Sequence, residues 1–159
     1  MIHTILTSSD IATLKALVLA DPTASVLAAE ARDVELADWL NQATSYIVWR
    51  SVLTPAMART AVVSGTGLGQ LDNLNSGKRE ALLYAFDGDL DVSDVNVRTS
   101  LDDLCGTQTA LKASIQAAEK RAASRAEKAL ATGTGTTATP GALAWEGVIS
   151  YSDASLIRS

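Results

Sequence analysis

The longest predicted helical segment of this chain, residues 108–131, most constrains what it can fold into. Gly106 and Thr107 precede this stretch, and Thr132 and Gly133 follow it. Six apolar side chains recur in it at helical spacing and share one narrow face: Leu111, Ile115, Ala118, Ala122, Ala126 and Ala129. A stripe of alanines lets another helix approach closely. The pattern therefore predicts one long C-terminal helix packed against a helical bundle.

Shorter helices are predicted before this stretch from their start signals. Asp21 with Pro22, and Thr54 with Pro55, each combine a capping side chain with a proline in the first helical turn. Other starts are expected at the polar residues 7–10 and at Asp33, Asp72 and Ser93. Alanine and leucine dominate a composition that is 47% hydrophobic and only 4% aromatic. We therefore predict an all-α fold, a compact bundle of short helices plus the long helix.

Residues 46–53 are β-branched and aromatic at their start, so that they fit a strand, a buried linker or a helical turn equally well. At 159 residues the chain is long enough for one soluble domain with an appendage. We place the helical body at residues 1–131.

A spacer rich in glycine and threonine begins at Thr132 and cannot hold a helix. Large apolar residues follow it, which predicts an extended C-terminal arm over residues 132–159 with a possible single strand: Leu143, Trp145, Val148, Ile149 and Tyr151. Trp145 and Ile149 either fold back onto their own bundle or anchor the arm in another molecule. We take Trp145, Val148, Ile149 and Tyr151 as candidate partner contacts.

The net charge of −5 argues against a sequence-specific nucleic-acid reader, although it allows DNA to pass without binding. Cys105 is the one cysteine, so no disulfide within the chain is expected. We also expect no membrane span and no signal peptide, and hence synthesis in a cytoplasm.

The motifs that carry chemistry are incomplete. Gly65, Gly67 and Gly69 superficially resemble a phosphate loop, but Asp72 and Arg79 stand where the Gly77–Lys78 pair would need a preceding glycine and a following Ser or Thr. We therefore predict a flexible loop. Residues 87–91 begin like a calcium loop, but Val92 and Arg98 stand where glycine and glutamate are needed. A single His3 excludes a histidine-dependent triad or a multi-histidine metal site. We therefore expect no enzyme activity, no catalytic residues, no cofactor and no metal.

Three cations lie together on the predicted long helix, about a quarter to a third of a turn from the alanine stripe: Arg121, Arg125 and Lys128. This ridge is either a solvated face or a surface for an acidic neighbour or a nucleic acid that is not read by sequence. The three residues are added to the candidate partner contacts.

The C-terminal string KRAASRAEKALATGTGTTATPGALAWEGVIS, from Lys120 to Ser150, resembles the end of small proteins encoded in tailed-phage and prophage morphogenesis clusters. Further matching strings cover most of the chain: WLN at 39–41, VWRS at 48–51, LDNLNSGKREALLYAF at 71–86 and NVR at 96–98. By architecture the chain is similar to the helical head-tail adaptors of the virion neck.

This resemblance implies a structural virion protein made in the bacterial cytoplasm. It implies a homo-oligomeric ring, of about twelve copies, that lies beneath the portal protein, contacts neighbouring neck or tail proteins and lets DNA pass through. The alternative is a helical binding or regulatory protein, a phage scaffold or a host-directed factor, that captures one partner as a monomer or dimer.

Overall fold

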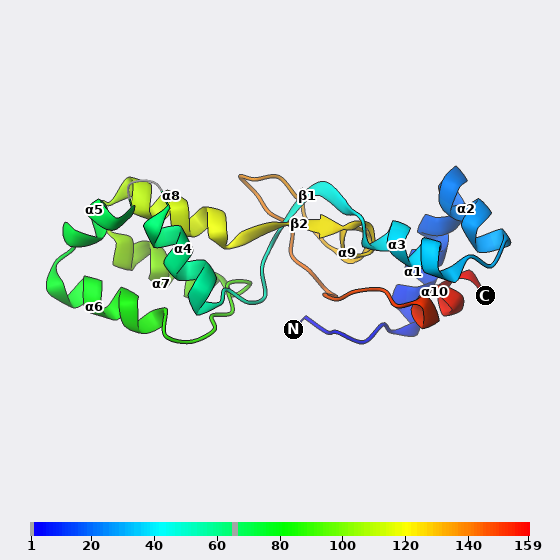
Figure 1. Cartoon of the computed structure of the whole chain (residues 1–159), viewed down its shortest axis with the longest axis horizontal. Helices are drawn as coiled ribbons and strands as arrows, with labels where there is room; N and C mark the ends of the chain where they lie inside the picture. Colours follow the sequence, from blue (N-terminus) through cyan, green and yellow to red (C-terminus); the bar gives the residue numbers. More distant parts are fainter. Residues whose placement is uncertain (1, 65–66) are drawn as a thin grey trace. The chain divides into compact units, whose positions relative to one another are not determined.

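The computed structural model describes residues 2–64 and 67–159, and its elements are mostly helices (Figure 1). Contacts divide the chain into two compact units. Unit 1 comprises Met1–Val48 and Ala122–Ser159, and unit 2 comprises Trp49–Arg121. The helical fold class is therefore confirmed in its coarse form. The predicted boundary at residue 131 separates a helical body from a C-terminal arm. The two units are instead defined by packing, and the chain passes between them near residues 48 and 122.

Unit 1 packs the first three helices against the C-terminal part of the chain. Its helices are α1 (Ser8–Ala20), α2 (Pro22–Ala29), α3 (Asp33–Asn41), α9 (Arg125–Leu130) and α10 (Tyr151–Arg158). The core contains Leu14, Leu36, Leu40 and Ile157, which are fully buried. Helix α10 packs on α3 and α1, and α9 packs on the same two helices.

Unit 2 is a second, separate helical core. Its helices are α4 (Pro55–Val63), α5 (Gly67–Asp72), α6 (Ser76–Ala85), α7 (Val95–Cys105) and α8 (Thr109–Ala118). Leu53, Leu82, Phe86 and Leu111 lie at its centre, each at most 2% exposed. Helix α8 contacts α4, α5 and α7, so it is the central element of this unit.

The prediction of one long helix over residues 108–131 is wrong. The chain instead forms α8, then strand β2 (Lys120–Ser124), then α9. Strand β2 pairs with β1 (Ala43–Trp49). Of the interpretations left open for residues 46–53, the strand is therefore correct for residues 46–49. The pairing satisfies backbone groups that a helix would otherwise satisfy, and it breaks the alanine stripe at Ala122.

The start signals that combine a cap with a proline are confirmed. Asp21 accepts hydrogen bonds from the backbone N–H groups of Thr23 and Ala24 at 2.9 and 3.0 Å, and Thr54 caps α4. Three other starts are shifted by one to three residues. Arg32 rather than Asp33 is the N-cap of α3, Asn75 rather than Asp72 caps α6, and Asp94 rather than Ser93 caps α7.

The loop predicted around Gly65, Gly67 and Gly69 is wrong from Gly67 onwards. Helix α5 begins at Gly67, which contradicts the loop predicted over 67–70, and Gly65 lies outside the described residues. In the described part of the chain no single helix is long and apolar enough to cross a membrane. Helices α1 and α2 meet that test only when joined, and they are bent by 109° at their junction.

The predicted spacer is held against β1. The hydroxyl of Tyr46 donates to the carbonyl of Gly133 at 2.8 Å, and the N–H of Ile47 donates to the carbonyl of Gly135 at 2.7 Å. A Cβ built at Gly135 would lie 2.1 Å from the Tyr46 ring, and one at Gly141 would lie 2.5 Å from it. The glycines are therefore used for close approach to an aromatic ring.

Candidate functional site

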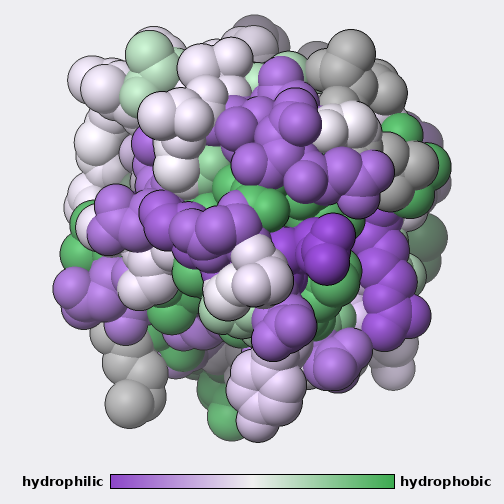
Figure 2. All heavy atoms as spheres, turned by 90° about the vertical axis from the view of Figure 1, so that its left-hand side faces the viewer, coloured by the Kyte–Doolittle hydropathy of each residue, from purple (hydrophilic) through white to green (hydrophobic). Residues whose placement is uncertain are grey.

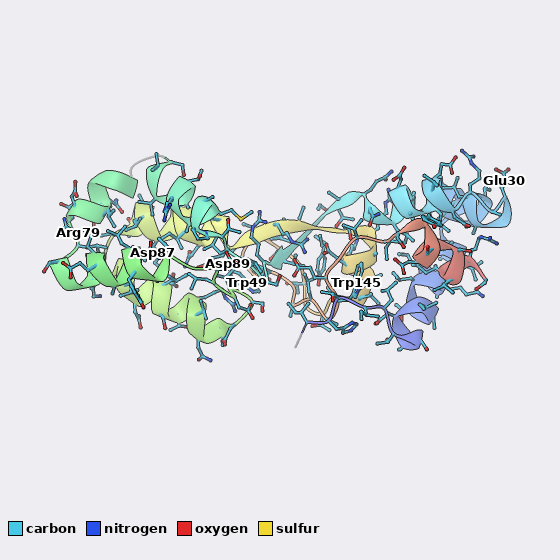
Figure 3. The ribbon with its side chains drawn as sticks, turned by 60° about the horizontal axis from the view of Figure 1, so that its bottom comes forward. Glu30, Trp49, Arg79, Asp87, Asp89 and Trp145 are labelled. Atoms are coloured by element: carbon cyan, nitrogen blue, oxygen red, sulfur yellow. The ribbon has the colours of Figure 1, made fainter. Side chains whose placement is uncertain are left out.

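The end of the chain is packed into unit 1 as part of its core. Trp145 and Ile149 are each 2% exposed, and the indole N–H of Trp145 donates to the Thr4 carbonyl at 3.1 Å (Figure 3). Of the two alternatives left open for these residues, the structure shows packing against their own unit. No strand is assigned between residue 132 and α10. Isolated bridges, such as the one between Val48 and Gly141, hold this segment in place.

One side chain fastens this segment to α3. The side-chain amide of Asn41 donates to the Ile149 carbonyl at 2.8 Å, and its oxygen accepts from the Ile149 N–H at 2.8 Å. Both backbone groups of a buried residue are thus satisfied by one asparagine. Helix α10 then begins with a capping box between Ser150 and Asp153.

Between and beside these buried anchors, Val148 and Tyr151 face the solvent. Val148 is 78% exposed and Tyr151 is 67% exposed. Their neighbours Trp145 and Ile149 hold the backbone in position, so these two apolar side chains are presented from an ordered segment. They are the members of the predicted aromatic and aliphatic set that remain available to a partner.

The predicted basic ridge does not exist as one helical face, because Arg121 lies in β2 while Arg125 and Lys128 lie in α9. Arg121 also belongs to unit 2. Arg125 and Lys128 are three residues apart on one short helix and therefore remain neighbours. They line a hollow in unit 1 of about 230 Å³, here called the basic hollow, with Leu17, Asp21, Trp39, Thr44 and Ala129.

The Arg125 side chain is held in this hollow by contacts within unit 1. Its guanidinium carbon lies 4.4 Å from the centre of the Trp39 ring, a cation–π geometry. Its Nη2 donates to the side-chain oxygen of Gln42 at 3.0 Å, while its Nε is buried and has no hydrogen-bond partner. Asp21 lines the same hollow, but one of its carboxylate oxygens caps α2.

Unit 2 contains a buried carboxyl group that sequence reasoning missed. Glu119 is 1% exposed, and its Oε1 has no hydrogen-bond partner. Burial, and then the nearby negative charge of Asp102, raise the pKa of Glu119 to about 7. A signal was present, because Glu119 follows Leu111 and Ile115 at intervals of four residues and so continues their apolar face.

The groups around Glu119 form a polar cluster between α7 and α8. The ammonium group of Lys112 lies 2.9 Å from a carboxylate oxygen of Asp102, and the Gln116 amide donates to both Asp102 oxygens at 2.9 and 3.0 Å. Cys105 is also buried, and desolvation followed by Asp102 raises the pKa of its thiol to about 11. Such a thiol remains protonated at neutral pH and is a poor nucleophile.

A second hollow in unit 2 is lined mainly by apolar side chains and has a volume of about 540 Å³. Its wall includes Val63, Leu83 and Tyr84, which are 59%, 46% and 81% exposed. Figure 2 faces the side of unit 2 and shows apolar atoms exposed among hydrophilic ones. Arg59 and Asp87, 3.5 Å apart, lie at this hollow.

The other candidate groups take part in local contacts. His3 Nδ1 lies 2.9 Å from the Ile5 carbonyl, and the aspartates of residues 87–94 lie on the connection between α6 and α7. Within residues 2–64 and 67–159, no group of three or more His, Cys, Asp or Glu side chains is arranged to hold a metal ion.

Comparisons with known proteins give no further assignment: no family model, no curated protein and no solved structure matches the chain.

Proposed function

We propose that this protein is a non-enzymatic structural component of a tailed-phage virion, a head-tail adaptor. In this proposal it forms a homo-oligomeric ring beneath the portal and joins the capsid vertex to the tail. It is made in the bacterial cytoplasm and ends in the virion neck. The resemblance of residues 120–150 and of the shorter strings to morphogenesis proteins supports the class, and the mostly helical fold is compatible with it.

The observation that carries the proposal is the pair of exposed apolar side chains on the C-terminal segment. Val148 and Tyr151 are exposed while Trp145 and Ile149, close to them in sequence, are buried. Burial of apolar surface contributes about 25 cal/mol per Å², so covering an aliphatic side chain and an aromatic ring favours association. A contact of this size is weak in one copy and becomes strong when a ring repeats it.

The charge of the chain agrees with a passage for DNA. At −5 the protein gives no net attraction to phosphates, so that DNA can move past it without being retained. This argument concerns the whole chain and assigns no residue to DNA.

The test is assembly with the portal protein encoded in the same morphogenesis cluster, followed by native mass spectrometry. We expect the portal to gain a complete ring of this protein. The double variant Val148→Ser, Tyr151→Ser is expected to lower the bound fraction roughly tenfold while the protein stays folded. Substitution is preferable to truncation, because removal of the C-terminal segment would also remove the core residues Trp145 and Ile149.

The matched control is the double variant Val26→Ser, Val34→Ser, which changes two exposed apolar residues on α2 and α3. It is expected to bind the portal like the wild type. A wild-type protein that stays a monomer or dimer and ignores the portal would contradict the proposal and favour the alternative of a helical protein that captures a single partner. Equal portal binding by both double variants would show that Val148 and Tyr151 do not contribute to the contact.

A further inference from the structure

The two ends of unit 2 are joined by hydrogen bonds from one residue. Unit 2 begins at Trp49 and ends at Arg121. The backbone N–H of Arg50 donates to the Glu119 carbonyl at 2.8 Å, and the Nε of Arg50 donates to the Ala118 carbonyl at 2.9 Å. The last carbonyls of an α-helix have no partner within the helix, so Arg50 supplies donors that α8 lacks. We call this set of bonds the clasp.

The side chain of Glu119, which lies at the clasp, is buried. It is 1% exposed, and its Oε1 has no hydrogen-bond partner among the residues that the structure describes. The ionisable groups around it come from several elements: Arg98, Asp102 and Cys105 on α7, Lys112 on α8, Lys120 on β2 and Arg50 on the segment before α4.

Two of the cations near this carboxyl group have other partners. The guanidinium carbon of Arg98 lies 4.0 Å from the centre of the Trp49 ring, and the ammonium group of Lys120 lies 5.1 Å from it (Figure 3). The Arg98 guanidinium also donates to two backbone carbonyls just before α7, at 2.6 and 2.7 Å. Both cations are therefore held by groups other than the carboxyl of Glu119.

The protonated and the ionised carboxyl group favour different states of the clasp. Lys112 is paired with Asp102 at 2.9 Å, so an ionised Glu119 would add a second negative charge near this pair. A buried charge without a partner is costly, whereas a neutral carboxyl group is tolerated in the same place. Opening of the end of α8 would hydrate the carboxylate and remove that cost.

We propose that Glu119 is a pH-dependent switch that controls the clasp at the ends of unit 2. While the carboxyl group keeps its proton, the end of α8 is formed and Arg50 is bonded to it. When the proton passes to the solvent, the end of α8 opens locally and Arg50 is released. The core around Leu53 and Leu82 does not include Glu119 and stays folded. This inference does not depend on the proposed function.

Native-state hydrogen exchange, followed by NMR at low concentrations of urea, tests whether the opening is local. Two amides report on the clasp: that of Arg50, and that of Glu119, which donates to the Ile115 carbonyl at 3.0 Å. The amides of Leu53 and Leu90, bonded to each other's carbonyls at 2.8 and 3.1 Å, report on the core. We expect urea to accelerate exchange of the core amides steeply and of the clasp amides only slightly, because a local opening exposes little surface.

The opening of the clasp should also depend on pH. The pKa of Glu119 is about 7 in the closed state and returns to its ordinary 4.5 when the carboxyl group is hydrated, so the opening constant should rise roughly tenfold from about pH 6 to about pH 8. It is taken from exchange rates corrected for the intrinsic rate at each pH. Glu119→Gln keeps the shape of the side chain and should abolish the rise. The exposed Glu80→Gln is the matched control and should behave like the wild type.

Two results would overturn the inference. If the clasp and core amides show the same dependence on urea, the clasp opens only when the whole unit unfolds, whatever the effect of Glu119 on global stability. If the clasp opens locally but to the same extent at both pH values, or with the same pH dependence in Glu119→Gln, its opening is not controlled by this proton.

Discussion

Glu119 gives the sharpest stability prediction. Its ordinary pKa of 4.5 is raised to about 7, chiefly by burial and then by Asp102, whereas Arg98 and then Lys120 and Lys112 act in the opposite direction. Between about pH 4.5 and pH 7 the Glu119 carboxyl is therefore protonated in the folded state and deprotonated in the unfolded chain. Stability from this group is fully present below about pH 4.5 and falls as the pH rises to about 7, where the loss is complete.

The size of the effect follows from the same values. Each tenfold change in proton affinity corresponds to about 1.4 kcal/mol, so the shift from 4.5 to about 7 corresponds to about 3 kcal/mol of unfolding free energy. Glu119→Gln removes the charge and keeps the shape. We therefore expect the glutamine variant to be more stable than the wild type by about 3 kcal/mol at about pH 8, and nearly equal to it at about pH 4.5.

The assay is urea unfolding of both proteins across this range of pH, with the free energy of unfolding taken from each curve. The difference between the two proteins cancels the contributions of all other titrating groups. Hydrogen exchange measured on α8 should show the gain locally, because Glu119 follows this helix directly. Glu80→Gln, which changes an exposed carboxylate on α6, is the matched control and is expected to unfold like the wild type.

A difference between Glu119→Gln and the wild type that is the same at both ends of the pH range would refute the reasoning. So would a wild-type protein that is the more stable of the two at about pH 8, because a favourable buried charge would then be lost in the variant.

Two further substitutions test the fastening of the C-terminal part of the chain. Asn41→Ala should lower the free energy of unfolding by about 2–3 kcal/mol, because it leaves both backbone groups of the buried Ile149 unsatisfied. Urea unfolding measures this loss, with the exposed Asn73→Ala as the control. An equal effect of the two variants would contradict the prediction. Gly135→Ala should lower the free energy of unfolding by about 2 kcal/mol or more, since the φ of Gly135 is +64° and the added Cβ would meet the Tyr46 ring. Thermal unfolding measures this, with Gly88→Ala, where the space is open, as the control. Equal melting temperatures of the two variants would contradict the prediction.

The sequence predicted those features that local chemistry determines. Asp21 with Pro22 and Thr54 with Pro55 mark helix starts in the structure, because a cap and a proline act within one turn. The same local logic contained a missed signal. Ser124 and Glu127 form a capping box, with Ser124 N–H to Glu127 at 2.9 Å and Glu127 N–H to Ser124 at 3.2 Å. That box marks the start of α9 inside the predicted long helix.

The remaining features depend on contacts between distant parts of the chain. Nothing local distinguishes residues 120–124 from a helix, because their strand exists only through pairing with β1, about 75 residues earlier in the chain. The basic hollow is equally non-local. Periodicity placed Arg125 beside Lys128, but Trp39 and Gln42, which orient the guanidinium, come from α3 and its end.

The burial of Trp145 and Ile149 changes how an adaptor of this kind would assemble. An arm that ordered only on the portal would have to expose both side chains beforehand, at roughly 2 kcal/mol or more each, and would lose the hydrogen bonds to Asn41. Since about 1.4 kcal/mol is a factor of ten, such a released state would be populated below about one part in a thousand. For the adaptor proposed above, the binding-competent form would therefore be the folded segment itself, with Val148 and Tyr151 already presented, and assembly would not have to bear the cost of ordering an arm.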